Sequence, residues 1–166
     1  FSRNRALIIK LIIFLAIFEV FNNVESISLT CDFLQTIRGY SCMAKNLKIT
    51  SKDDRTINEV FGIHSRGKSN RDVEYFQATD LEIEYFPLNL GGFFNNLDFI
   101  MISNTPMKEL KATDLQQFGS QFKSFNIERS DLEVLERGLF NSMPNLESVS
   151  MVHNKIKHVD DGVFTS

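Results

Sequence analysis

The sequence contains no tryptophan, and its 166 residues include only three prolines and two cysteines. The cysteines lack C-x-x-C spacing and have no accompanying His/Cys set, which argues against a redox pair or a zinc site. Neither G-x-S-x-G nor H-E-x-x-H occurs, so two common enzyme signatures are missing. Basic residues are not in excess, and the formal net charge of −3 argues against general nucleic-acid binding.

Long apolar runs are also missing. The uninterrupted run Leu11–Phe18 is too short to cross a bilayer, which needs about 20 residues. A basic segment, Arg3–Lys10, precedes it, and Val24–Ser26 offers a small-residue cleavage site. This arrangement predicts a signal peptide over residues 1–26 and a secreted, extracellular protein; the alternative is a signal anchor extended to Phe21.

What the sequence does contain is an apolar template, L-x-x-L-x-L-x-x-N-x-L-x-x-L-x-x-G-x-F, that recurs at intervals of 24 or 25 residues. Such periods and spacing are typical of leucine-rich repeats. The copies are Leu146, Val149, Met151, Asn154, Ile156, Val159, Gly162 and Phe164; Phe122, Phe125, Ile127, Ser130, Leu132, Leu135, Gly138 and Phe140; Leu97, Ile100, Ile102, Thr105, Met107 and Leu110; and, more weakly, Val73, Phe76, Ala78, Leu81, Ile83 and Phe86.

Each x-L-x-L-x segment predicts a short strand whose alternate side chains point inward. Val149 and Met151 are therefore expected inside, and the returning chain is expected to bury Phe140 and Phe164. In the Asn position only Asn154 fits the template; Ser and Thr replace it in the two preceding copies, and Leu81 in the first.

The repeats resemble the 24-residue type of extracellular leucine-rich-repeat proteins, such as Toll-receptor ectodomains and secreted insect relatives. Residues 31–73, with TCDF, YSC, LKITSKDDRTI and GIHSRGKSNRDV, are similar to the N-terminal cap of secreted dipteran proteins of that kind. The resemblance implies binding and supplies no catalytic position.

The predicted fold is an α/β-type leucine-rich-repeat solenoid. It has a curved parallel sheet on the concave side, a mostly irregular or short-helical convex side, and a disulfide β-hairpin as N-terminal cap. The predicted divisions are the signal peptide (1–26), the cap (27–72) and about four repeats (73–166).

An even cysteine count in an oxidising compartment predicts a disulfide between Cys31 and Cys42. Thr30–Phe33 and Tyr40–Met43 are expected to form the arms of a hairpin across Arg38-Gly39. At the other end no cap follows the last repeat. We expect further repeats or a cap beyond Ser166, a membrane link only if a span follows there, and self-association through the uncapped edge.

One segment, Gly62–Ser69, satisfies the phosphate-loop pattern G-x-x-x-x-G-K-[ST]. A phosphate loop needs a long helix after it, but the first repeat begins at Val73. We interpret the segment as a turn, and a nucleotide-binding enzyme is the unfavoured alternative. His153 and His158 are expected at the surface, so neither a metal nor another cofactor is predicted.

The predicted function is protein–protein recognition through the concave face, by a secreted module or by the truncated ectodomain of a membrane receptor. A protein ligand or receptor is the expected partner, and nucleic acid is not. Outward strand positions should align in rows, with exposed Tyr75, Phe99 and Met101 clustered, unless the cap covers them. The predicted partner-binding residues are Tyr75, Gln77, Phe99, Met101, Asn126, Glu128 and Arg129.

Overall fold

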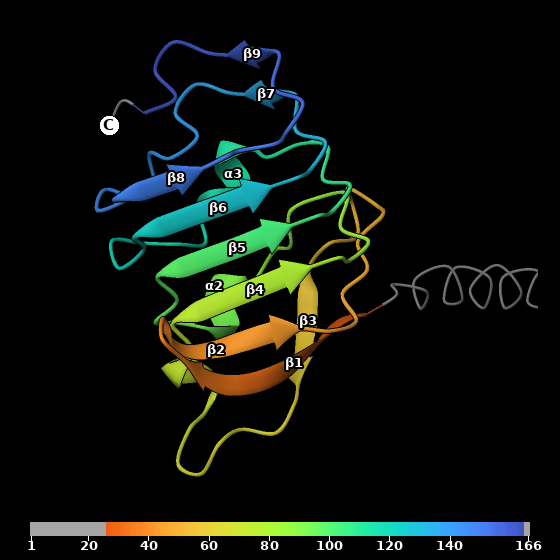
Figure 1. The fold of residues 1–166 in the computed structure, drawn as a ribbon, viewed down its shortest axis with the longest axis vertical. Coiled ribbons are helices and arrows are strands. Elements are labelled where there is room, and N and C mark those ends of the chain that lie inside the picture. The colour runs from red at the N-terminus through yellow and green to blue at the C-terminus, as the bar shows by residue number, and fades with distance from the viewer. Residues whose placement is uncertain (1–25, 165–166) are drawn as a thin grey trace, which may run out of the picture.

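The computed structural model describes residues 26–164, so the predicted signal peptide lies outside the described residues except for Ser26. Seven strands form one open sheet in the order β3-β1-β2-β4-β5-β6-β8 (Figure 1). Their bounds are β1 Ile27–Thr36, β2 Gly39–Ala44, β3 Ile57–Phe61, β4 Tyr75–Thr79, β5 Phe99–Ser103, β6 Ser124–Glu128 and β8 Ser148–Ser150.

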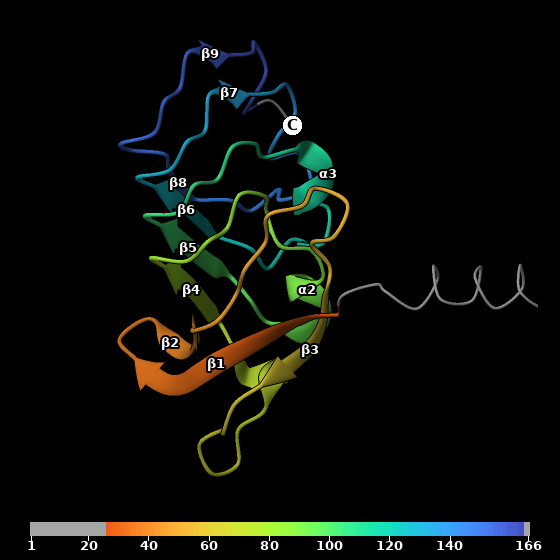
Figure 2. The same ribbon diagram turned by 90° about the vertical axis from the view of Figure 1, so that its right-hand side faces the viewer.

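The remaining elements are short. Two-residue strands β7 (Val134–Leu135) and β9 (His158–Val159) form a separate parallel ladder. The helices are the 3-10 turn η1 (Asn70–Asp72) and two four-residue α-helices, α2 (Leu90–Phe93) and α3 (Ala112–Leu115). Both α-helices lie on the same side of the sheet, together with the long connections (Figure 2). No helix within residues 26–164 is long and apolar enough to cross a membrane.

The template predicts the register of four strands correctly. Strands β4, β5, β6 and β8 are parallel neighbours, and Tyr75 pairs with Phe99, Phe99 with Ser124, and Ser124 with Ser148. This alignment follows from the alternation of side chains along each strand, because a slip of one residue would turn every apolar side chain out of the core.

The predicted fold class is nevertheless wrong. The sheet is mixed, since β1 is antiparallel to β2 and parallel to β3, and its strand order does not follow a run of stacked repeats. The physical reason is that residues 27–61 lack the apolar template and contribute three further strands by their own pairing. The four template strands therefore belong to an open seven-stranded sheet, not to an α/β-type leucine-rich-repeat solenoid.

The hairpin and its disulfide are confirmed, with Phe33 paired to Cys42 and a Cys31–Cys42 bond between the arms. The hairpin is not the outermost part of the sheet, because β3, which also lies within residues 27–72, pairs with the outer edge of β1. The hairpin is fastened to the next strand as well: the Tyr40 amide donates to Glu74 Oε2, and the Glu74 amide donates to Tyr40 O.

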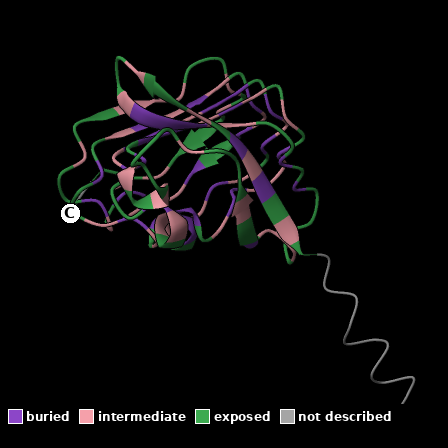
Figure 3. Ribbon diagram, turned by 90° about the horizontal axis from the view of Figure 1, so that it is seen from below, coloured by how far each residue is buried: buried purple, intermediate pink, exposed green. Residues whose placement is uncertain are grey.

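One apolar core runs between the sheet and the connections, from Leu29 to Val163. Buried segments pass through the middle of the molecule and exposed ones surround them (Figure 3). Phe140 is buried as predicted, but Phe164 is 68% exposed and Val149 and Met151 are only partly buried. The reason is their place beside the last strand, where no described element covers them.

Asn154, at the Asn position of the last copy, hydrogen-bonds backbone groups with its side chain. The Asn154 amide donates to Ile127 O and Met151 O, and its Oδ1 accepts from the Ser130 amide. Ser130 Oγ in turn lies 3.1 Å from Thr105 Oγ1. Asn154 and Ser130 thus satisfy backbone atoms in the turns after β8 and β6, whereas Leu81 occupies this position after β4.

Candidate binding face

One face of the sheet lies opposite α2 and α3 (Figure 2), and its residues align in rows across the strands. Strand pairing defines them. The first row contains Ser41, Tyr75, Phe99, Ser124 and Ser148, and the second contains Met43, Gln77, Met101, Asn126 and Ser150. We call these two rows, with Thr79, Ser103 and Glu128 beyond them, the open face.

The aromatic part of the open face is not exposed as predicted, because Tyr75 and Phe99 are each only 5% exposed. Their rings stack at 4.7 Å, and the Arg38 guanidinium lies 4.5 Å from the centre of the Phe99 ring. Tyr75 also donates to Gln77 Oε1 at 2.7 Å. The turn of the hairpin therefore folds Arg38 over the pair. This agrees with the alternative that the predicted cap covers these residues, although the sequence did not identify Arg38 as the residue that does so.

Burial raises the pKa of the Tyr75 hydroxyl, while the nearby Arg38 charge works in the opposite direction. The phenol therefore stays protonated near neutral pH and remains a donor. Since it donates to Gln77, it fixes one polar side chain of the second row in place.

The second row is more accessible than Tyr75 and Phe99, and so are Thr79 and Glu128 in the third row, whereas Ser103 is buried. Gln77, Met101, Asn126 and Glu128 are half-buried, and Arg129 is exposed. Hydrogen bonds hold the third row in place: Thr79 Oγ1 lies 3.1 Å from Ser103 Oγ, and Ser150 donates to Glu128 Oε1 at 3.0 Å. Fixed side chains lose little conformational freedom when a partner binds, which favours affinity.

A shallow depression of about 260 Å³ lies where β2 and β4 end. Met43, Lys45, Gln77 and Thr79 are among the residues that line it. The sequence alone predicted Gln77 here but missed Met43, because residues 39–44 do not carry the template.

Arg129 has an unusual backbone. Four residues at equivalent positions after the template strands adopt left-handed conformations, namely Asp80, Asn104, Arg129 and His153, with φ between 51° and 58°. Asp, Asn and His are enriched in this region, whereas Arg is not. The structure thus keeps an exposed arginine at the rim of the open face in a costly conformation.

A charged row lies just before the strands, with Glu74, Asp98, Lys123 and Glu147 in equivalent positions. Desolvation by burial raises the pKa of the Asp98 carboxyl; Lys123 opposes this shift, and Glu74 and Glu147 add to it. This edge is therefore mainly acidic, whereas Arg129 lies at the other end of β6.

The segment Gly62–Ser69 is a loop and is followed only by the three-residue η1. A phosphate loop would need a long helix at this place, so the geometry gives no support to nucleotide binding. His64 occupies a site that the sequence did not reveal. Its ring stacks 3.8 Å from Phe33, its Nδ1 lies 3.1 Å from the Tyr40 hydroxyl, and its Nε2 lies 3.0 Å from Asn70 Oδ1.

Metal-ligating residues do not gather in groups of three or more within the described part of the chain. His153 and His158 are both exposed. His158 Nε2 lies 2.6 Å from Asp160 Oδ1, and this contact lowers the pKa of the Asp160 carboxyl.

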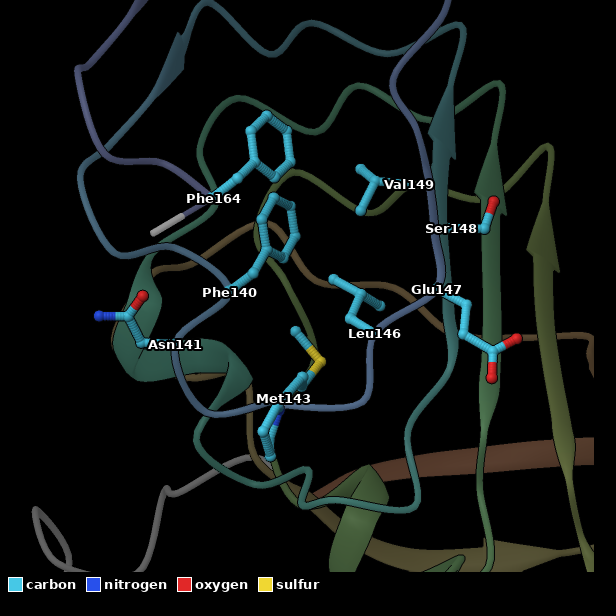
Figure 4. A pocket seen from close by; sticks show the side chains of 9 residues that line it. Phe140, Asn141, Met143, Leu146, Glu147, Ser148, Val149 and Phe164 are labelled. Atoms are coloured by element: carbon cyan, nitrogen blue, oxygen red, sulfur yellow. The ribbon is translucent and has the colours of Figure 1, made fainter. Parts of the chain in front are cut away.

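The β8 end of the core is open. A cavity of about 500 Å³ there is lined mainly by apolar side chains, with Phe140, Met143, Leu146, Val149 and Phe164 turned toward it (Figure 4). The rings of Phe140 and Phe164 stack at 5.4 Å. Apolar surface is thus accessible beside the last strand.

In comparisons with known proteins, this chain matches no protein-family model and no curated protein. The functional argument therefore rests on the residues and their geometry.

Proposed function

We propose that this protein is a secreted binding module that recognises a protein partner through the open face. The observation that carries the proposal is the second row, in which Met43, Gln77, Met101, Asn126 and Ser150 cross five adjacent strands on one face. Methionine is enriched at protein interfaces, and polar neighbours supply hydrogen bonds around it.

Two further features support this function. Arg129 stands at the rim in a strained backbone conformation, and strained residues gather where binding constrains a position. The signal-peptide pattern at residues 1–26 and the disulfide both favour an extracellular location. In this proposal the buried Tyr75 and Phe99 side chains support Arg38 from below and do not contact the partner directly.

The test is a binding screen of the secreted protein against an array of extracellular proteins, followed by variants. Met101→Glu should abolish binding to the recovered partner, because it places an unpaired charge in the centre of the second row. The matched control is Gln116→Glu at the exposed end of α3, which introduces the same charge on the other side. Binding that survives Met101→Glu but not Gln116→Glu would refute the open face as the site.

A further inference from the structure

A second surface lies at the opposite end of the sheet from β8. The connection from β3 to η1 forms a loop that extends past β1 and is the lowest part of the molecule in Figures 1 and 2. Its turn is closed by a hydrogen bond from the Lys68 amide to Ser65 O at 2.9 Å. Gly67 has φ of +78°, and a Cβ at this position would meet no other atom within 4 Å. Beside it, the Lys68 ammonium lies 5.4 Å from the centre of the Tyr40 ring.

The base of this loop is firmly held. The Tyr40 hydroxyl, on a side chain that is only 1% exposed, lies within hydrogen-bond distance of both the His64 ring and the Ser65 amide. At the far end, Asp72 accepts hydrogen bonds from the Ser69 amide and hydroxyl, each at 2.9 Å. The hydrogen bonds at both ends of the loop therefore hold its backbone in place.

The exposed side chains of the loop are of two kinds, aliphatic and basic. Ile63, beside the inward-facing His64, is 91% exposed. Residues 61–71 carry Arg66, Lys68 and Arg71 but no acidic residue, although the whole chain has a net charge of −3. Lys68 Nζ lies 3.5 Å from Asp72 Oδ1, just beyond this segment. The Arg66 and Arg71 guanidinium groups form no ion pair with a carboxylate within residues 26–164. Positive charge is thus concentrated at one end of an acidic protein.

We propose that this loop docks the protein onto membrane surfaces that contain anionic lipid. An isolated aliphatic side chain flanked by basic residues suits the boundary between headgroups and acyl chains, where the aliphatic group inserts and the cations meet the headgroups. A sulfated glycan would use the charges but leave Ile63 in water, and a protein interface would be expected to use a broader, packed patch. This surface is separate from the open face and does not depend on its role.

The test uses protein recovered from the medium of secreting cells and measures co-sedimentation with phosphatidylcholine vesicles, with or without phosphatidylserine. We expect binding only with phosphatidylserine, and weakening as salt rises. Ile63→Ser should weaken binding at least tenfold, since it removes the inserted side chain. Arg66→Ser should weaken it about fivefold, whereas Arg66→Lys should retain it.

Ile37→Ser is the matched control for the apolar change. Ile37 is fully exposed on the turn between β1 and β2, outside the basic segment. Vesicle binding that is insensitive to Ile63→Ser, or equally sensitive to Ile37→Ser, would overturn the proposal. Binding to immobilised heparin without any binding to anionic vesicles would overturn it as well, and would identify a polyanion site.

Discussion

At the residue scale, the strained position of Arg129 has a measurable consequence. A side chain with a Cβ costs about 1 kcal/mol or more in the left-handed region, whereas glycine adopts it freely. We expect Arg129→Gly to raise the free energy of unfolding by about 1 kcal/mol while weakening binding at the open face. His153→Gly is the control, because histidine is among the residues enriched in the left-handed region and His153 has φ of 58°. Urea unfolding measures both, and a lower stability for Arg129→Gly would contradict the strain argument.

Asp98 offers a second test at this scale. Because burial raises its pKa above 3.8 in the folded state, the native protein holds this proton more tightly than the unfolded chain does. Its contribution to stability therefore falls as pH rises from about 3.8 through the folded-state pKa. Relative to the unaltered protein, Asp98→Asn should therefore raise Tm more at pH 7 than at pH 3. Glu59→Gln, at an exposed position on β3, is the control, and equal changes in Tm for the two variants would exclude burial of Asp98 as the cause.

At the scale of elements, the β1–β2 hairpin depends on its disulfide. The cysteines are 11 residues apart, and closing a loop of this size stabilises the folded state by about 3 kcal/mol in the chain-entropy model. We expect the double variant Cys31→Ala/Cys42→Ala to lose that amount in thermal unfolding. Mass spectrometry after alkylation of the native protein should find no free thiol; two alkylated cysteines would refute the bond in solution.

The individual strands also show which parts of the fold the sequence could predict. The register of β4, β5, β6 and β8 follows from a local pattern in which inward positions such as Phe76, Ile100 and Phe125 are apolar. The pairing of β1 with β3 joins segments about 30 residues apart that share no repeated pattern, so no local signal specified it. The fold class failed for this reason.

The open face was predicted in its rows and only partly in its exposure. Alternation along the strands places Gln77 and Met101 side by side, and their pairing confirms it. The burial of Phe99 depends on Arg38, which lies 61 residues earlier and reaches the ring only because the hairpin packs beside β4. A contact of this kind depends on tertiary structure, and the sequence pattern does not contain it.

At the scale of the whole molecule, the apolar cavity at the β8 end predicts self-association. Exposed apolar surface beside the outer edge of β8, which pairs with no strand within residues 26–164, favours contact with a second copy, because burial removes that surface from water. Sedimentation equilibrium of the protein should show mass rising with concentration, and Phe164→Ser should reduce this effect. Because Phe164 is 68% exposed, the variant should leave Tm nearly unchanged. Phe140→Ala, beneath it and only 6% exposed, should instead cost about 3–5 kcal/mol of stability. Equal, small stability losses at both positions, or association insensitive to Phe164→Ser, would contradict this account of the open end.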